Sequence, residues 1–229
     1  MNRALLVGAA LALDNEARTR VQRAQGEFGD DVASFSERLG RWGPTAPIVV
    51  GGSLLVGGLT EGNTGVRKGL AVISGMALGS LPTNAAKFLV GRKRPNSGAG
   101  TLELDPFSGH KSFPSGHATF IFSIAASIDE VTESPWLAGG AYGLATLTGF
   151  ERIYDDKHWL SDVVAGAIMG TLSGRFAARR AARMLGIARR PEPGPGGDGA
   201  AGLPPGAESR GPRVSFLATA GFVGVHVTF

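Results

Sequence analysis

Five apolar stretches rich in glycine and alanine constrain the fold of this chain more than any other feature. They are Ala46–Thr60, Gly69–Val90, Ala118–Ile128, Trp136–Phe150 and Trp159–Ala177. Their length and composition predict a helix in each. Because 43% of the 229 residues are hydrophobic, the chain is able to bury one substantial core. The sequence therefore predicts an all-α fold, a helical bundle of five or six helices.

The last of these stretches carries Gly166, Gly170 and Gly174, which repeat every four residues. Residues four apart lie on one face of a helix, and a row of glycines allows a second backbone to approach closely. We therefore expect this helix to pack tightly against a neighbour.

The segment before the core, residues 1–44, has two parts. Met1–Leu13 is apolar and is either a plain N-terminal helix or a signal or anchor, although it is too short to span a bilayer. Asp14–Gly40 is polar with apolar residues at near-helical spacing, which predicts an amphipathic helix. The predicted helical core then covers residues 45–190.

Two segments follow the core. Residues 191–213 are rich in proline and glycine and show no periodicity, as in a flexible linker. In residues 214–229 the apolar side chains of Val223, Val225 and Val227 alternate with other residues. This alternation predicts a short strand-like C-terminal tail.

Composition narrows the chemistry of the chain. It contains no cysteine, which excludes disulfides and thiol nucleophiles. The net charge of +4 favours anionic partners without selecting one. The arginines after Gly174 stand at a helix end, where anionic lipid headgroups explain them more simply than nucleic acid. Nucleic acid is therefore not expected as a partner, and no protein partner is predicted.

The apolar stretches leave membrane insertion open. They run short of the ~20 residues that a spanning helix usually needs, but short helices span where the bilayer thins. If all five cross, Arg67 and Lys68 fall on the same side as the arginines after the last stretch. We expect transmembrane helices in the cytoplasmic membrane and an active site facing the periplasm. The alternative is a soluble or peripheral periplasmic protein.

Three groups of polar residues stand at the ends of the apolar stretches. They are Lys87 with Arg94-Pro95, Ser115-Gly116-His117, and Arg152 with His158 and Asp162. Phosphoryl transfer spreads negative charge over three oxygens, which fixed cations and N–H donors stabilise. Lys87, Arg94 and Arg152 are suited to this task, since an arginine fork donates paired hydrogen bonds to phosphate. Ser115 and Gly116 precede a predicted helix, whose first N–H groups are free to bind an anion.

His158 and Asp162 are four residues apart, which places them on one face of a helix. The carboxylate is then able to accept a hydrogen bond from one ring nitrogen of His158, which leaves the other nitrogen free as a nucleophile.

In this order, the three groups resemble the signature motifs of the type 2 phosphatidic acid phosphatase (PAP2) and vanadium haloperoxidase superfamily, over Lys87–Asp162. The resemblance to its phosphatase branch implies a metal-independent lipid phosphate phosphatase or acid phosphatase that hydrolyses a phosphomonoester or diphosphate. It implies that His158 attacks phosphorus to form a phosphohistidine, Asp162 orients it, and His117 protonates the leaving oxygen. The implied phosphate-binding residues are Lys87, Arg94, Ser115, Gly116 and Arg152. No cofactor or metal is implied, and the expected partner is a phosphorylated lipid or other phosphate ester.

Three alternatives stay open at this point. The same cage of cations would bind vanadate in a vanadate-dependent haloperoxidase, although the haloperoxidases it resembles are longer chains. The chain is otherwise a non-catalytic phosphate-binding envelope protein. Carboxylates and imidazole are also common metal ligands, so Asp155, Asp156, His158 and Asp162 form a possible metal cluster.

Two residues near the motifs need a separate interpretation. The family usually has serine before the arginine of its third motif, where this chain has Glu151. We expect the Glu151 carboxylate to point away from the phosphate site, because a carboxylate facing it would weaken anion binding. His110 belongs to none of the three motifs, and we expect an exposed loop histidine.

Overall fold

The computed structural model describes residues 2–23, 25–187, 213–219 and 222–228. The chain divides into two compact units, Met1–Arg190 and Pro191–Phe229, each described by itself. The first unit is all-α. Its helices are α1 (Arg3–Arg23), α2 (Glu27–Gly40), α3 (Trp42–Glu61), α4 (Asn63–Gly79), α5 (Leu81–Val90), α6 (Gly116–Val131), α7 (Pro135–Tyr154) and α8 (Leu160–Met184), with a short 3₁₀ turn at Pro95–Ser97.

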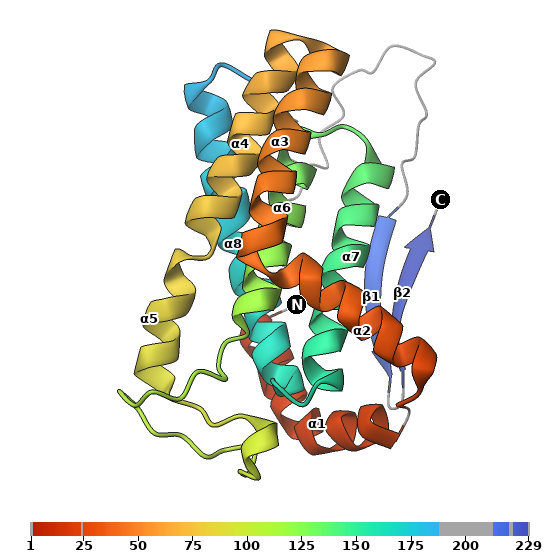
Figure 1. Cartoon of the computed structure of the whole chain (residues 1–229), viewed down its shortest axis with the longest axis vertical. Coiled ribbons are helices and arrows are strands. Elements are labelled where there is room, and N and C mark those ends of the chain that lie inside the picture. Colours follow the sequence, from red (N-terminus) through yellow and green to blue (C-terminus); the bar gives the residue numbers. More distant parts are fainter. Residues whose placement is uncertain (1, 24, 188–212, 220–221, 229) are drawn as a thin grey trace, which may run out of the picture. The chain divides into compact units, whose positions relative to one another are not determined.

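Helices α6 and α8 run side by side through the middle of the helical unit (Figure 1). A Cβ on Gly170 would come within 2.2 Å of the Thr119 carbonyl oxygen, and one on Gly174 within 2.5 Å of that of Ser123. Such distances admit no side chain, so the glycine row of α8 lies directly on the backbone of α6. The tight packing that the sequence predicted for this helix is confirmed.

The main core lies where α4, α6 and α7 meet. Met76, Phe120, Ile124 and Ala145 are buried there together. Helix α4 approaches closely because Gly75 presents no side chain: a Cβ there would overlap the Ser127 side chain. Small residues therefore set the helix spacing, and a few large apolar side chains fill the space that remains.

The unit has more helices than the five or six predicted. One extra helix arises within Gly69–Val90, where α4 ends at Gly79 and α5 begins at Leu81. Pro82 explains the break, because proline lacks the N–H that a continuous helix would need and is tolerated in a first turn.

The N-terminal segment also differs from its prediction. Helix α1 continues ten residues past Leu13 to Arg23, and α2 starts afresh at Glu27 after the extended Gly26. The prediction of one amphipathic helix over Asp14–Gly40 is therefore wrong. Helix α1 packs on α8 and α7, and α2 packs on α7, so both belong to the helical unit.

Within the described residues, no helix combines the length and apolar character needed to cross a bilayer. The transmembrane helices expected from the sequence are not found in that part of the chain.

The second unit contains an antiparallel pair of strands, β1 (Arg213–Thr219) and β2 (Phe222–Thr228). Their register pairs Val214 with Val227 and Phe216 with Val225. The predicted linker, residues 191–213, lies outside the described residues except for its last position.

Candidate active site

The three motifs meet at one end of the helical unit, the lower end in Figure 1. Lys87 lies in the last turn of α5, which Gly91 ends in a left-handed conformation. Ser115 caps the start of α6, where its Oγ accepts from the Ala118 N–H. Arg152 lies in the last turn of α7, and His158 stands just before α8. Residues far apart in sequence thus converge because four helix ends coincide.

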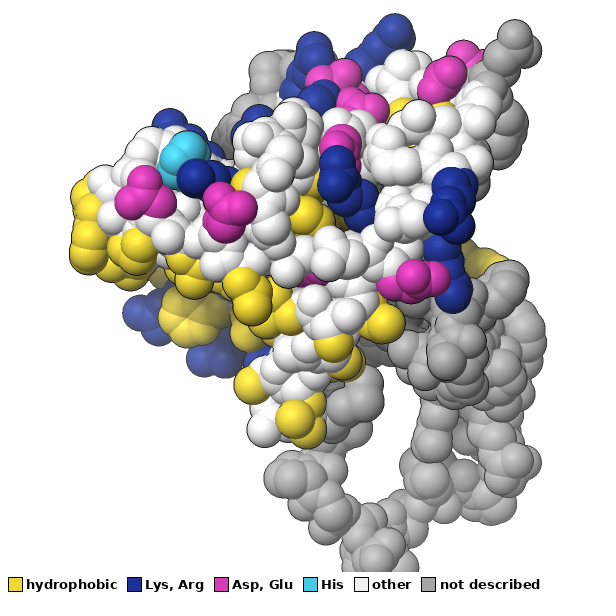
Figure 2. Space-filling view, turned by 90° about the horizontal axis from the view of Figure 1, so that it is seen from below, with side chains coloured by type: hydrophobic (Ala, Val, Ile, Leu, Met, Phe, Trp, Pro, Cys, Tyr) yellow, Lys and Arg dark blue, Asp and Glu magenta, His cyan; other side chains and the backbone are white. Residues whose placement is uncertain are grey.

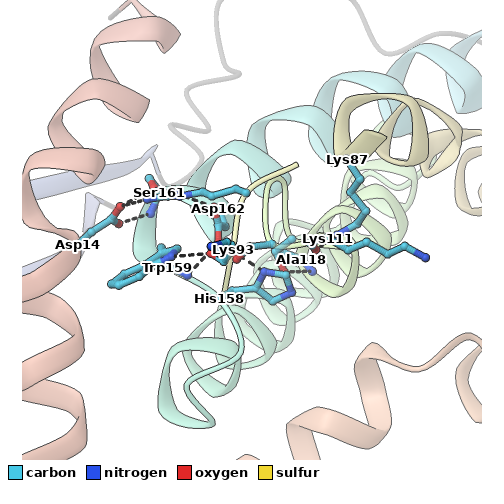
Figure 3. Close-up of polar contacts among 12 residues, drawn as sticks. Asp14, Lys87, Lys93, Lys111, Ala118, His158, Trp159, Ser161 and Asp162 are labelled. Atoms are coloured by element: carbon cyan, nitrogen blue, oxygen red, sulfur yellow. Dashed lines mark hydrogen bonds and ion pairs between the residues drawn. The ribbon is translucent and has the colours of Figure 1, made fainter. Parts of the chain in front are cut away.

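His158 and Asp162 form the centre of the site (Figure 3). His158 is 3% exposed and Asp162 is fully buried. The His158 Nδ1 lies 3.6 Å from the Asp162 Oδ2, slightly beyond hydrogen-bond length, and has no other partner in the described part of the chain. Because Nδ1 faces the carboxylate, Nε2 points to the opposite side of the ring. The two side chains are thus close together, as predicted, but His158 stands before the first residue of α8, so the prediction that they share one face of a helix is wrong.

Both side chains have perturbed pKa values. Burial lowers the pKa of His158 to about 4, against the opposing effect of Asp162, and the charges of Lys87 and Arg94 lower it further. The pKa of Asp162 is also lowered: burial works to raise it, but His158, Arg92 and Ser112 together outweigh that effect. At neutral pH the pair is therefore a neutral imidazole beside a carboxylate, and a neutral imidazole carries the lone pair that a nucleophile needs.

Lys87 lies over the start of α6. Its Nζ donates to the Lys111 carbonyl oxygen at 2.7 Å. A Cβ on Gly116 would stand 3.5 Å from the Lys87 Cε, so the glycine leaves room for the ammonium beside the first turn of the helix. Burial, with help from the charge of Arg94, lowers the pKa of Lys87 to about 8. Lys87 is still mostly protonated at neutral pH.

Arg94 and Ser115 complete this side of the site in different ways. Arg94 is exposed, and its charge acts on both Lys87 and His158. Ser115 is buried, and its N–H donates to the Asp162 carbonyl oxygen at 2.9 Å. The Ser115 N–H is thus occupied. The N–H groups of Gly116 and His117 come next in the first turn, where the helix itself supplies no acceptor.

Arg152 and Glu151 form a pair that the sequence did not predict. Both are buried, and the Arg152 Nε and Nη2 each donate to one oxygen of the Glu151 carboxylate. The Glu151 carboxylate thus contacts one of the cations predicted to bind phosphate, a contact that the expected outward orientation did not include. This carboxylate pairs with the guanidinium because a buried carboxylate has no water to solvate it. Burial also raises the pKa of Glu151 to about 7, against the effect of Arg152.

His117 is half-buried near Arg152 and His158. Burial and the charge of Arg152 lower the pKa of His117 to about 3, while Glu37 of α2 acts in the opposite direction. His117 is therefore neutral at pH 7. A dianionic phosphate beside it would raise this pKa, since an opposite charge favours the protonated imidazole.

Sequence reasoning missed three residues that hold Asp162 in place. Its Oδ1 accepts from the Arg92 Nη1 at 2.7 Å, and its Oδ2 accepts from the Ser112 Oγ at 2.5 Å and from the Trp159 N–H at 2.9 Å. Arg92 stands between Lys87 and Arg94 in the sequence, where it is indistinguishable from a solvated surface cation. Only its burial reveals its role.

The alternative metal cluster does not assemble. Asp155 pairs with Lys157 at 2.7 Å, and Asp156 pairs with Arg18 at 2.6 Å. The described residues contain no group of three or more histidine or carboxylate side chains placed to hold a metal ion. His110 is exposed near Asp105, as expected, and lies in the loop before α6.

The fold and the site define a helical protein with cationic side chains and a helix start gathered around a buried, neutral histidine. The chain belongs to the PAP2 superfamily, whose model matches residues 68–183. This match confirms the resemblance drawn from the motifs, all of which lie within it. The crystal structure of Aquifex aeolicus LpxE has the same fold, with a TM-score of 0.55 at 24% identity, over 73% of this chain and 95% of that chain.

Three curated relatives each match a similar share of the chain. The lipid A 1-phosphatase of Porphyromonas gingivalis is 37% identical over 104 residues, 44% of this chain and 21% of the relative. A probable lipid phosphate phosphatase beta of Arabidopsis thaliana is 28% identical over 41% of this chain and 56% of its own length. The undecaprenyl-diphosphatase of Sulfolobus acidocaldarius is 27% identical over 45% of this chain and 50% of its own length. The matches thus span between a fifth and just over half of these relatives.

Proposed function

We propose that the protein is a metal-independent phosphatase that removes a phosphoryl group from a phosphorylated lipid through a phosphohistidine on His158. The observation that carries the proposal is the buried, neutral His158 imidazole, which has Asp162 on one side and the charges of Lys87 and Arg94 nearby. Family membership and three relatives named for lipid phosphate or diphosphate hydrolysis support the substrate class.

In the first step, the Nε2 of His158 attacks phosphorus as the bond from phosphorus to the leaving oxygen breaks. The leaving oxygen takes a proton from His117, whose pKa the bound phosphate has raised. Positive charge develops on the phosphorylated imidazole, and Asp162 stabilises it through Nδ1.

In the second step, water attacks phosphorus, and the bond between nitrogen and phosphorus breaks to restore His158. The proton that the water loses passes to His117, which is then ready for another turnover. Lys87, Arg94, Arg152 and the first N–H groups of α6 are the groups we assign to the phosphoryl oxygens in both steps.

An amphiphilic substrate agrees with the surface near the site. The end of the molecule seen in Figure 2 carries hydrophobic side chains beside Lys and Arg. Phe88, next to Lys87 in the sequence, and Phe107 are 55% and 65% exposed and pack edge to face with ring centroids 5.3 Å apart. The exposed aromatic pair supports action at a membrane surface, and we propose that this surface is the periplasmic face of the cytoplasmic membrane. Extraction of membranes with alkaline carbonate distinguishes integral from peripheral attachment.

Phosphate release by the purified protein tests the proposed activity. The substrates are phosphatidate, lipid A phosphate, undecaprenyl diphosphate and a soluble phosphomonoester. We expect turnover of at least one lipid, and a loss of at least about 10³-fold in His158→Ala. His110→Ala, which removes an exposed histidine outside the site, is the matched control and should keep full activity. Full turnover in His158→Ala would exclude His158 as the nucleophile.

A further inference from the structure

Asp14 of α1 belongs to none of the motifs, but it reaches the active site. It is fully buried. Its Oδ1 accepts from the Ser161 N–H at 2.8 Å, and its Oδ2 accepts from the Ser161 Oγ at 2.7 Å and from the Arg92 Nη2 at 2.8 Å. A carboxylate without water is stable only when such bonds compensate it. The fold therefore stabilises this buried charge with hydrogen-bond donors from two other segments of the chain.

Arg92 connects Asp14 to the catalytic pair. Its side chain is 2% exposed, and its Nη1 donates to the Asp162 Oδ1 at 2.7 Å while its Nη2 donates to Asp14. The guanidinium also lies over the Trp159 ring, 5.5 Å from its centroid. Figure 3 shows Asp14 and Ser161 on one side of Asp162 and His158 on the other.

The charges of this cluster do not balance. Two carboxylates share one guanidinium, so Asp14, Arg92 and Asp162 carry a net charge of −1 in a site that water does not reach. The imidazole of His158, 3.6 Å from Asp162, is placed to balance that charge when it becomes positive. Without Asp14, Arg92 and Asp162 would neutralise each other, and little negative charge would remain for His158.

We propose that Asp14 and Arg92 are positioning residues, and that Asp14 preserves the negative charge with which Asp162 stabilises the positive imidazole. The inference rests on the proposed function, in which His158 becomes positive when it is phosphorylated. Asp14 does not contact the phosphate-binding residues, so its removal should lower kcat and leave KM nearly unchanged.

A series of variants that change the charge of the cluster tests this effect of Asp14 on His158. The readout is the pKa of His158, measured by NMR on the full chain. The other groups that act on His158 are Lys87 of α5, Arg94 of the following loop and His117 of α6, and the series leaves them unchanged. Asp14→Asn brings the cluster to zero charge, and Arg92→Gln brings it to −2. The double variant returns it to −1. The pKa of His158 should therefore be highest in Arg92→Gln, intermediate in the wild type and the double variant, and lowest in Asp14→Asn.

Turnover supplies the second readout. Asp14→Asn should lower kcat about tenfold, the factor that corresponds to a change of one in the pKa of the imidazole, and adding Arg92→Gln should recover part of that loss. Arg20→Gln is the matched control, because Arg20 also lies on α1 and forms an exposed ion pair with Glu16 at 2.6 Å, without contacting Asp14 or Arg92. It should keep kcat within about twofold, as expected for an exposed ion pair.

A purely structural role for Asp14 predicts that the double variant has a lower kcat than either single variant, and that outcome would overturn the proposed electrostatic role of Asp14. Equal His158 pKa values across the series would overturn it as well. If Asp14→Asn does not fold, the pKa of His158 in Arg92→Gln, compared with the wild type and the double variant, still tests the proposal. The order of the His158 pKa values in the variants does not depend on turnover. Inactivity of the wild type, or full activity of His158→Ala, would therefore refute the proposed function, while the pKa values would still test the electrostatic role of Asp14.

Discussion

Glu151 should control how tightly the site binds phosphate, and the control should depend on pH. When its carboxylate is ionised, it occupies both donor groups with which Arg152 would otherwise bind a phosphoryl oxygen. Glu151→Gln removes the negative charge and keeps the size of the side chain. We expect this variant to bind inorganic phosphate more tightly than the wild type at pH 8.

The size of the gain follows from the bonds involved. A hydrogen bond to a charged group contributes about 1.5–3 kcal/mol, which corresponds to roughly 10- to 100-fold in affinity. The pKa of Glu151 is raised from 4.5 to about 7, so the wild-type carboxylate is mostly protonated at pH 5.5 and mostly ionised at pH 8. The advantage of the variant should therefore be large at pH 8 and within about threefold at pH 5.5.

The same shift affects stability. A carboxyl with a raised folded-state pKa stabilises the folded state below its unfolded pKa, and this contribution disappears as pH rises through the folded value. Between pH 4.5 and 7 the wild type should lose about 2 to 3 kcal/mol, once screening by nearby solvent is allowed for, because its pKa is about 7. Glu151→Gln should not show this loss.

Competitive inhibition by inorganic phosphate, measured from pH 5.5 to 8.5, is the assay. The ratio of the two inhibition constants at each pH cancels the ionisation of phosphate itself. Glu37→Gln is the control, because Glu37 stands 3.9 Å from the Arg152 Nη2 and is partly exposed. It should give a smaller gain. Equal inhibition of Glu151→Gln and the wild type at pH 8, or a gain of the same size at both ends of the range, would refute this account of Glu151.

Three further predictions concern packing and chemistry. Gly170→Ala should destabilise the protein by about 1–3 kcal/mol or more, because its Cβ meets the Thr119 carbonyl oxygen, whereas Gly139→Ala, with open space around it, should stabilise it by up to ~1 kcal/mol; equal melting temperatures would contradict this packing. His117→Ala should slow the first step, measured as pre-steady-state release of the leaving group, about 10²–10⁴-fold with a poor leaving group and much less with p-nitrophenyl phosphate, and an equal loss in this step with both would exclude a role in leaving-group protonation. Exhaustive chelation should leave activity intact, and a loss that Mg²⁺ or Zn²⁺ restores would favour metal-assisted hydrolysis.

Much of the fold follows from the sequence because helix ends and close contacts have local signals. The glycine row of α8 predicted its close packing on a neighbouring helix, and the spacing of His158 and Asp162 predicted that the two lie close together, although His158 precedes α8. The predicted number of helices was too low because the apolar composition of Gly69–Val90 indicates one continuous helix. Pro82 divides this stretch into two helices.

The rest of the site depends on burial, which no local pattern reports. Glu151 was expected to face outward because a carboxylate in an anion site is unfavourable, but the helix places it beside Arg152 with no solvent around it. Asp14 and Arg92 are 78 residues apart, and each reads in sequence as an ordinary surface charge. Their pairing arises only where α1 and the loop after α5 both pack against the start of α8, contacts that residue spacing does not predict.

A crystal structure with bound vanadate, grown near pH 6 where Glu151 is mostly protonated, tests the central claim most directly. The account predicts vanadium bonded to the His158 Nε2, with Lys87, Arg94 and Arg152 within hydrogen-bond distance of its oxygens. Vanadate bonded to another residue, or bound at His158 with those three cations turned elsewhere, would contradict it.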